Sequence, residues 1–345
     1  LSGTLQGAGG VGGLLAIRTG SGETATVYHP LYDGNGNVTQ LIKDHGSGGD
    51  ELVAHYEYDP FGNLTSNLDL DQTALLRFVF VGVGLLAVFI TYYLTRTSQI
   101  WEVGTREVVY MGIGAALYAL FSFIFNGTVF VVPSVSQVAI RPAIAIPMFF
   151  GFAFGPAVGF FTGAVGNMFG DALTGFGLSP QWSVGNGLVG MIAGMVHLFK
   201  DKKSSLNVVL GIGFVLTLIA TAIFLVNRNV PNMLFFDVEN GIFGDQQISL
   251  FAGLSVVIGL VLVLVVRFAF AKNVEIAAAV TWSMLGNLIG LGFAAVSDVW
   301  INGFPLPVAI VGEFLPAAGP NLLFAAILVP ILVAAYNAVQ AQTGR

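Results

Sequence analysis

The chain has 345 residues, of which 55% are hydrophobic and 9% are charged, and its formal net charge is −6. Ordinary soluble domains carry about 25% charged residues, so this composition excludes a purely soluble protein and indicates a chain that lies largely in a membrane. Because the sequence contains no cysteine, it excludes a disulfide framework, a thiolate metal site and a cysteine nucleophile.

The first 66 residues predict a small β-rich module. Short β-prone runs alternate here with turn dipeptides such as Asp33-Gly34 and Asn35-Gly36. The excess negative charge lies in this part, since residues 1 to 70 hold eight acids and two basic residues, whereas the rest of the chain holds eleven of each. Leu1 opens the sequence without a signal peptide, so we expect the true N-terminus to lie upstream.

Two stretches of this module, YDGNGNVTQLI and YEYDPFGNLTS, resemble the repeats of RHS or YD-repeat proteins. In that family Tyr-Asp hairpins stack into large extracellular β-shells, and the matching pairs here are Tyr32-Asp33 and Tyr58-Asp59. The resemblance covers nearly all of residues 7 to 66. Repeat architectures need several neighbours to bury a core, so two repeats imply a remnant of such a shell.

Apolar runs of membrane length begin after residue 73 and predict an all-α polytopic membrane protein behind the β-hairpin module. Two of the runs are short and are joined by GFAFGP, which predicts either a tight helical hairpin or a broken helix. The nine predicted spans lie near residues 74–95, 107–125, 140–154, 156–173, 184–199, 206–226, 248–271, 276–297 and 320–339.

The basic residues predict the orientation of these spans, because cytoplasmic loops carry an excess of Lys and Arg. With nine spans, eight of the eleven basic residues after residue 70 fall on one side. We therefore expect a multi-pass protein of the prokaryotic cytoplasmic membrane, with the β-module outside and the C-terminus inside. The eight are Arg96, Arg106, Lys200, Lys202, Lys203, Arg267, Lys272 and Arg345, and the other three are Arg77, Arg141 and Arg228.

Polar residues gather near the predicted outer ends of the spans and predict a pocket open to the outside. Any one of them is also explained as a cap or an interfacial residue. Asp171 and Arg141 are the strongest candidates, because opposite charges on adjacent helices could neutralise each other or hold a zwitterionic ligand. Trp182 fits an interfacial aromatic as well as a ligand-stacking one. The candidate substrate-binding residues are Asn126, Arg141, Asn167, Asp171, Trp182, Asn186, Asn287, Asp298 and Asn321.

The stretch GNMFGD places an amide and an acid, Asn167 and Asp171, four residues apart and so on one face of a helix. A carboxylate in a membrane span is costly, and its default interpretation is functional. Its Gly-Asn dipeptide recurs in two other spans. Small residues let helices approach closely and buried asparagines bond across the gap, so the recurrence predicts either interhelical contacts or a shared polar site. The three dipeptides are Gly166-Asn167, Gly185-Asn186 and Gly286-Asn287.

Most of residues 105 to 345 resembles the substrate-binding S components of energy-coupling factor (ECF) transporters. The stretches that carry the resemblance are TREVVYMGIGAALYALFSF, VAIRPAIAIPMFFGFAFGPAVGFFTGAVGNMFGDALTG, QWSVGNGLVGMIAG and FLPAAGPNLLFAAILVPILVAAYNAVQAQTGR. In that family a small helical membrane protein captures a vitamin or similar nutrient at its outer side and works with a T component and two cytoplasmic ATPase subunits. The resemblance implies a subunit that binds a small water-soluble vitamin, with no enzymatic activity, cofactor, metal or nucleic-acid partner.

The resemblance also implies a docking face for the T component at Ala115-x-x-x-Ala119 on the first core helix, although ordinary helix packing explains the same spacing. S components usually have six helices, whereas eight spans are predicted after residue 105. One explanation treats residues 206–271 as a two-helix insertion; the other is that some spans do not cross the membrane. The predicted domains are 1–70, a linking helix in 71–105, and 106–345.

Two rival interpretations remain. The sequence contains no Walker A motif, H-E-x-x-H or G-x-S-x-G, so an enzyme is not expected. An RHS-type polymorphic toxin with a membrane-inserting effector would explain the fusion, and the stretch from Asp59 to Gly62 fits both its D-P-x-G shell-closing pattern and an ordinary repeat. A pore-former should carry polar residues through the full membrane depth, which these spans do not. The third alternative is an artefactual joining of two unrelated sequences near residues 66–73.

Overall fold

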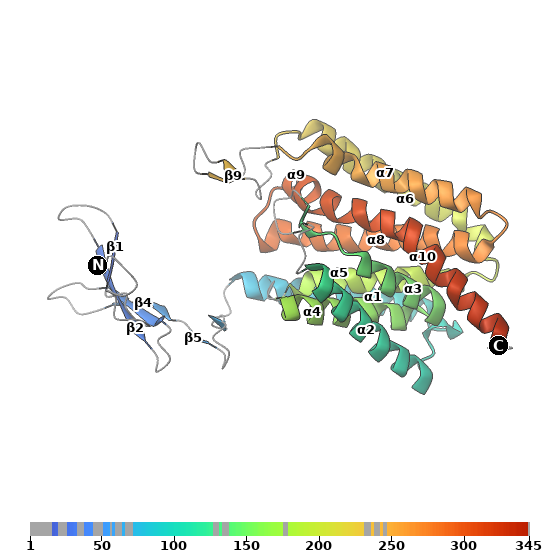
Figure 1. Ribbon diagram of the computed structural model, residues 1–345, viewed down its shortest axis with the longest axis horizontal. Coiled ribbons are helices and arrows are strands. Elements are labelled where there is room, and N and C mark those ends of the chain that lie inside the picture. The colour runs from blue at the N-terminus through green and yellow to red at the C-terminus, as the bar shows by residue number, and fades with distance from the viewer. Residues whose placement is uncertain are drawn as a thin grey trace. The chain divides into compact units, whose positions relative to one another are not determined.

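A computed structural model shows two compact units, Leu1–Asp71 and Gln72–Arg345 (Figure 1). The division into 1–70, 71–105 and 106–345 stays a prediction. The residues that the structure describes are 16–19, 26–32, 38–43, 51–55, 57–58, 64–65, 72–126, 131–132, 138–174, 179–230, 236–237, 242–243 and 247–343.

The first unit contains an antiparallel sheet with the strand order β1-β2-β3-β4, which confirms the small β-module. Tyr32 ends β2 and Tyr58 ends β5, and each of these strands pairs with the strand that follows it. The predicted Tyr-Asp hairpins therefore have strands at the expected places, while their RHS origin stays a prediction. The strands are β1 Ile17–Thr19, β2 Thr26–Tyr32, β3 Val38–Lys43, β4 Glu51–His55, β5 Glu57–Tyr58 and β6 Leu64–Thr65.

The second unit is helical, and each of the nine predicted spans coincides with a helix. The α-helices are α1 Gln72–Thr95, α2 Thr105–Asn126, α3 Ala145–Phe154, α4 Pro156–Thr174, α5 Pro180–Gly194, α6 Lys202–Val226, α7 Leu250–Ala269, α8 Val274–Ile301, α9 Leu306–Ala309 and α10 Leu315–Thr343. The short elements are η3 Gln99–Trp101, η4 Pro142–Ile144, η5 Met195–Leu198, the π-helix η6 Ile310–Phe314, and the strand pairs β7 Val131–Val132 with β8 Val138–Ala139 and β9 Phe236–Asp237 with β10 Ile242–Phe243.

Six helical segments in the described part of the chain are long and apolar enough to cross a membrane. They are α1, α2, α6, α7, α8 and the continuous segment Leu306–Thr343. The other three predicted spans lie in α3, α4 and α5. Helix α5 is buried along nearly its whole length against α3, α4 and α8. A helix covered by protein need not be apolar on every face, which explains why polar residues concentrate in α4 and α5.

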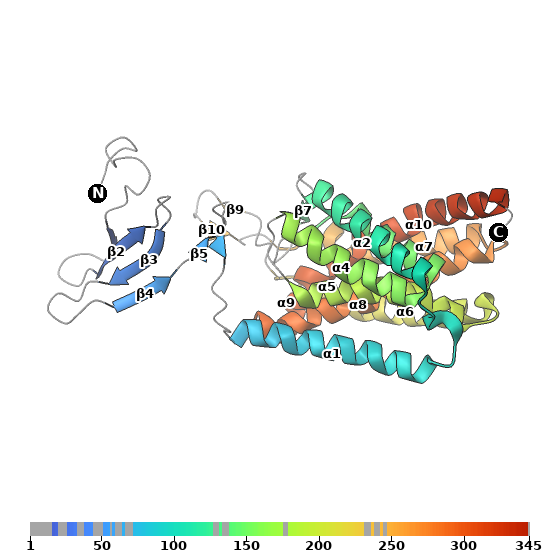
Figure 2. The same cartoon turned by 90° about the horizontal axis from the view of Figure 1, so that it is seen from below.

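Consecutive helices run in alternate directions, so the loops gather at the two ends of the bundle (Figure 2). One end, here named the network end, holds the last turns of α4 and α8 and the first turn of α5. The opposite end, named the basic end, holds the first turns of α2, α6 and α8 and the last turn of α7. Helix α1 lies along one face and packs on α5 and α8, while most of its apolar side chains are exposed, as in a helix that faces lipid.

The connection between α3 and α4 is a tight helical hairpin, which decides between the two alternatives for GFAFGP. Phe154 ends α3, Gly155 has a φ of +101° that glycine adopts without steric cost, and Pro156 begins α4. The helices then lie side by side, since a Cβ added to Gly159 would lie 2.6 Å from the Cα of Gly151. Side chains at these two positions would push the helices apart.

Glycines also bring α4, α5 and α8 into backbone contact. A Cβ added to Gly185 of α5 would lie 2.7 Å from the carbonyl oxygen of Gly290 in α8, and one added to Gly163 of α4 would collide with the backbone of Asn186. Without side chains between them, the three helices approach closely enough for short polar side chains to reach across. Helix packing therefore explains the glycines of the repeated Gly-Asn pattern and positions its asparagines.

Candidate functional site

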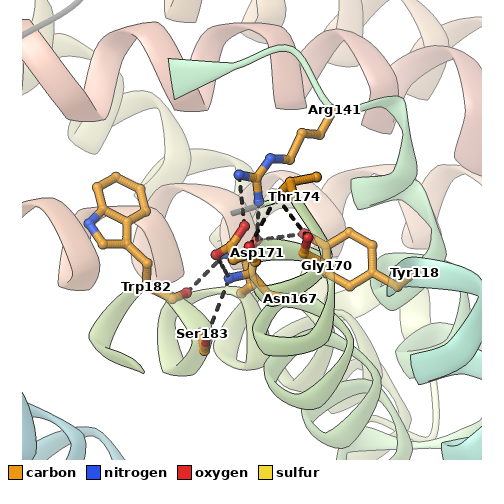
Figure 3. A network of polar contacts seen from close by, with 9 residues as sticks. Tyr118, Arg141, Asn167, Gly170, Asp171, Thr174, Trp182 and Ser183 are labelled. Atoms are coloured by element: carbon orange, nitrogen blue, oxygen red, sulfur yellow. Dashed lines mark hydrogen bonds and ion pairs between the residues drawn. The ribbon is translucent and has the colours of Figure 1, made fainter. Parts of the chain in front are cut away.

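A buried network of polar side chains lies at the network end, where α4 and α5 meet the residue before η4 (Figure 3). Arg141 Nη2 lies 3.0 Å from Asp171 Oδ1, and Arg141 Nη1 donates to Asn167 Oδ1 at 2.9 Å. Asn167 Nδ2 in turn donates to Asp171 Oδ2 at 2.7 Å. Each of the three side chains therefore contacts the other two, and the opposite charges predicted on neighbouring segments neutralise each other.

The local sequence of α4 explains this arrangement. Asn167 and Asp171 are one helical turn apart, so both side chains point from the same face of α4 toward the start of α5. Asn167 is fully buried and also donates to Ser183 Oγ of α5 at 3.3 Å. A buried carboxylate is costly unless it is paired and hydrogen-bonded, and Arg141 with Asn167 supplies both.

A second set of contacts connects α2 to α5. Tyr118 OH donates to Asn186 Oδ1 at 3.0 Å, and Asn186 Nδ2 donates to the backbone oxygen of Trp182 at 2.9 Å. Tyr118 is fully buried although it lies in a helix whose other faces are apolar and exposed. Asn186 thus bonds across a helix interface, which is the interhelical role that was one of the two interpretations of the Gly-Asn pattern.

The second buried acid of the network end is Asp298, near the end of α8. Its Oδ2 accepts from Trp182 Nε1 at 2.8 Å and its Oδ1 accepts from Gln181 Nε2 at 3.1 Å. Trp182 therefore contacts both groups of residues, through its backbone oxygen to Asn186 and through its indole to Asp298. This indole is held by a hydrogen bond and so differs from a freely rotating interfacial aromatic.

The structure brings six of the nine candidate residues to this end: Arg141, Asn167, Asp171, Trp182, Asn186 and Asp298. Asn287 instead bonds within the core, donating to the Ser283 backbone oxygen at 2.9 Å and to Met148 Sδ at 3.5 Å. Asn321 is buried in α10, and in the described ranges no hydrogen bond joins it or Asn287 to the network. The side chain of Asn126 lies outside the described residues, so its assignment stays a prediction.

Sequence reasoning missed four polar residues of this region. Tyr118 and Ser183 lie within apolar or small-residue runs, so no pattern singled them out. Ser183 lies one helical turn before Gly187, on the inward face of α5, and this spacing was the available signal for it. Gln181 stands next to the predicted Trp182 and could have been found there. Glu313 was assigned to a loop, whereas the structure places it, almost fully buried, in a π-helix, an element that often marks functional sites.

The structure places Ala115 and Ala119 in the interface between α2 and α4, while their assignment to a docking face for a T component stays a prediction. Both are buried, because this side of α2 packs on α4. A Cβ added to Gly166 would lie 2.9 Å from the Ala115 backbone oxygen, and one added to Gly170 would lie 3.6 Å from the Ala119 Cα. Two pairs of small residues with the same four-residue spacing thus face each other, which is ordinary packing within one chain.

Chemically, the network end offers hydrogen-bond donors and acceptors, which include the carboxylates of Asp171 and Asp298, the guanidinium of Arg141 and the indole of Trp182. Within the described ranges, no three His, Asp or Glu side chains are grouped so that they could hold a metal ion. Such a set suits the recognition of a small polar molecule that has donors and acceptors of its own.

Comparison with known proteins finds a family of transporter components that is similar to part of the helical unit. Residues 102–269, which include α2 to α7, match the family of the ECF-type riboflavin transporter, S component. The match runs through residues 206–269, so it gives no support to a two-helix insertion there.

Among curated proteins, the chain is similar to UPF0397 proteins. It is 34% identical over 98 residues to one from Vibrio atlanticus, covering 28% of this chain and 52% of the relative. It is 31% identical over 102 residues to one from Aliivibrio salmonicida and 34% identical over 102 residues to one from Aliivibrio fischeri, in each case covering 30% of this chain and 54% of the relative. The chain thus spans about half the length of these relatives. No solved structure matches it.

Proposed function

We propose that the helical unit is the membrane-embedded substrate-binding subunit of an ECF-type uptake transporter. It would take a small water-soluble, vitamin-like molecule at the outer face and hand it over through a T component powered by two separate ATPase subunits. The observation that carries this proposal is the buried network at one end of an otherwise apolar bundle. The match of residues 102–269 to the S-component family supports it independently.

The charge distribution supports an outward-facing site. Lys202 begins α6 and Arg267 lies in the last turn of α7, both at the basic end, whereas Asp171 and Trp182 lie at the network end. Cytoplasmic loops are enriched in Lys and Arg, so the basic end is the expected cytoplasmic side. The network would then face the compartment from which a nutrient is taken up.

The proposed binding mode uses the network as a preformed set of partners. Asp171 and Asp298 accept hydrogen bonds, Arg141 and Asn167 donate them, and the indole of Trp182 adds an aromatic surface. A flat heterocycle with donors and acceptors on its edge matches this combination. Riboflavin is the first ligand to test, because the matched family is named for its transport.

The proposal is tested by identifying the small molecules that co-purify with the chain. Mass spectrometry of the native protein should find a co-purifying molecule of vitamin size, and added riboflavin should be tested for saturable binding. A preparation that retains no small molecule and binds no vitamin would contradict the proposal. Ion flux through liposomes that contain the chain would instead favour the pore-forming toxin, since conduction needs a continuous polar path.

A further inference from the structure

A groove of about 350 Å³ lies between α6 and α7, two helices that contribute no residue to the polar network described above. Asn207, Leu210, Gly211 and Phe214 of α6 line one side, and Leu260 and Leu264 of α7 line the other. The wall is almost entirely apolar, with one amide at the basic end. Both helices are long and apolar enough to cross a membrane, so the groove opens along a surface that faces lipid chains.

Gly211 lines the groove and leaves open space beside α6. A Cβ added at this position would meet nothing within 4 Å, so the space beside α6 is open and is not filled by α7. Asn207 and Phe214, about one helical turn before and after it on α6, extend the wall of the groove in each direction. This shape suits a flexible hydrocarbon chain that lies along the two helices.

The end of the groove at the membrane surface carries a positive charge. Arg267 Nη2 donates to the Oδ1 of the lining residue Asn207 at 2.6 Å. Arg267 Nε is buried and has no hydrogen-bond partner, and none of the ion pairs in the described part of the chain involves this residue. The guanidinium therefore keeps donors and an unneutralised charge for an acceptor outside the protein.

We propose that this groove binds one anionic phospholipid, with an acyl chain between α6 and α7 and the phosphate at Arg267. Basic pockets between membrane helices at the cytoplasmic side are suited to anionic headgroups, and the apolar wall below this one matches a lipid rather than a soluble ion. Lys203, one turn before Asn207 on α6, adds positive charge at the same end. This site is independent of the proposed transport function.

The test is native mass spectrometry of the full chain in detergent, titrated with phosphatidylglycerol or phosphatidylcholine that carry identical acyl chains. The wild type should retain phosphatidylglycerol in preference to phosphatidylcholine. Arg267→Gln should lower the retention of phosphatidylglycerol about fivefold, the effect expected for one basic residue near an anionic headgroup. Arg106→Gln, at an exposed arginine of the basic end that pairs with Glu107, is the control and should change little.

A second pair of variants tests the groove itself. Gly211→Leu should fill the groove and lower the retention of both lipids. Gly112→Leu on α2 is the control and should not lower it. Both glycines have open space beside them, so both variants should fold. The proposal is overturned if the wild type retains the two lipids equally, or if either control has the same effect as its partner variant. It is also overturned if soluble glycerol phosphate displaces the lipid, or if Gly211→Leu changes the oligomeric mass without changing lipid retention.

Discussion

Each end of the helical bundle carries an ion pair, and the two pairs differ in how far their side chains are exposed to solvent. At the network end, Arg141 and Asp171 lie 3.0 Å apart with only 18% and 8% of their side chains exposed. At the basic end, Lys202 and Glu275 lie 2.6 Å apart, but 45% of the Glu275 side chain is exposed. Water solvates the charges of the second pair more readily than those of the first, so breaking the buried pair should cost more stability than breaking the partly exposed one.

The largest effect is expected for Arg141→Leu. This change leaves the Asp171 carboxylate buried beside Asn167 without its countercharge, and breaking one half of a buried pair typically costs about 3–5 kcal/mol. Thermal unfolding of the purified protein in detergent should show a strongly lowered midpoint. The double variant Arg141→Leu with Asp171→Leu should recover much of the loss, because it removes both charges. Equal midpoints for the single variant and the wild type would contradict the buried pairing.

A smaller loss is expected for Trp182→Phe. The phenylalanine keeps an aromatic ring but removes the indole Nε1 donor that lies 2.8 Å from Asp298 Oδ2. A hydrogen bond to a charged group contributes about 1.5–3 kcal/mol to stability, so the midpoint should fall by less than in Arg141→Leu. Trp300→Phe is the control, because Trp300 is largely exposed. If both tryptophan variants unfold alike, the indole bond contributes nothing measurable.

Ala115→Leu distinguishes packing from docking. Ala115 faces Gly166 of α4 at close range, so a larger side chain should force α2 and α4 apart and cost about 1–3 kcal/mol in the isolated chain. Gly112→Leu, one turn earlier on the open side of α2, should leave the unfolding midpoint unchanged. A stable Ala115→Leu protein that loses only its interaction with a T component would support the docking assignment.

The smallest effect is expected at the basic end. Glu275→Gln removes the acid that Lys202 Nζ contacts at 2.6 Å and 2.7 Å, but a partly exposed pair contributes about 0–1 kcal/mol. Added salt should also reduce the stabilising contribution of the Lys202–Glu275 pair more than that of the Arg141–Asp171 pair, since exposed charges are screened more strongly. A loss as large as that of Arg141→Leu would show that burial does not separate the two ends.

Much of this architecture could be predicted from the sequence, because hydropathy reports helices that face lipid. Nine of the ten α-helices in the described part of the chain, and the hairpin at Gly155, lay where apolar runs and a Gly-Pro pair indicated them. Hydropathy could not show that α5 is a central helix covered by its neighbours. Burial by protein and burial by lipid give the same apolar pattern, and only the polar residues of α4 and α5 suggested the difference.

The candidate site was predicted in part for a similar reason. Asp171 and Arg141 were found because charges in apolar spans are conspicuous, and their pairing was one of the stated possibilities. The bond from Tyr118 to Asn186 depends on which face of α2 packs on α4 and α5, which spacing alone does not determine. For Ala115 and Ala119, the small-residue spacing predicted a close helix contact, and the structure shows one with α4, but spacing alone does not identify the helix that is contacted.

The most direct test of the central claim compares ligand binding in Asp171→Asn and Glu275→Gln, one acid from each end. Binding of riboflavin, or of the molecule that co-purifies with the chain, would be measured by titration calorimetry in detergent. A charged hydrogen bond to the ligand is worth about 1.5–3 kcal/mol, so Asp171→Asn should weaken affinity roughly ten- to hundredfold while Glu275→Gln leaves it unchanged. Unchanged affinity in Asp171→Asn, or an equal loss in both variants, would contradict a binding site at the network end.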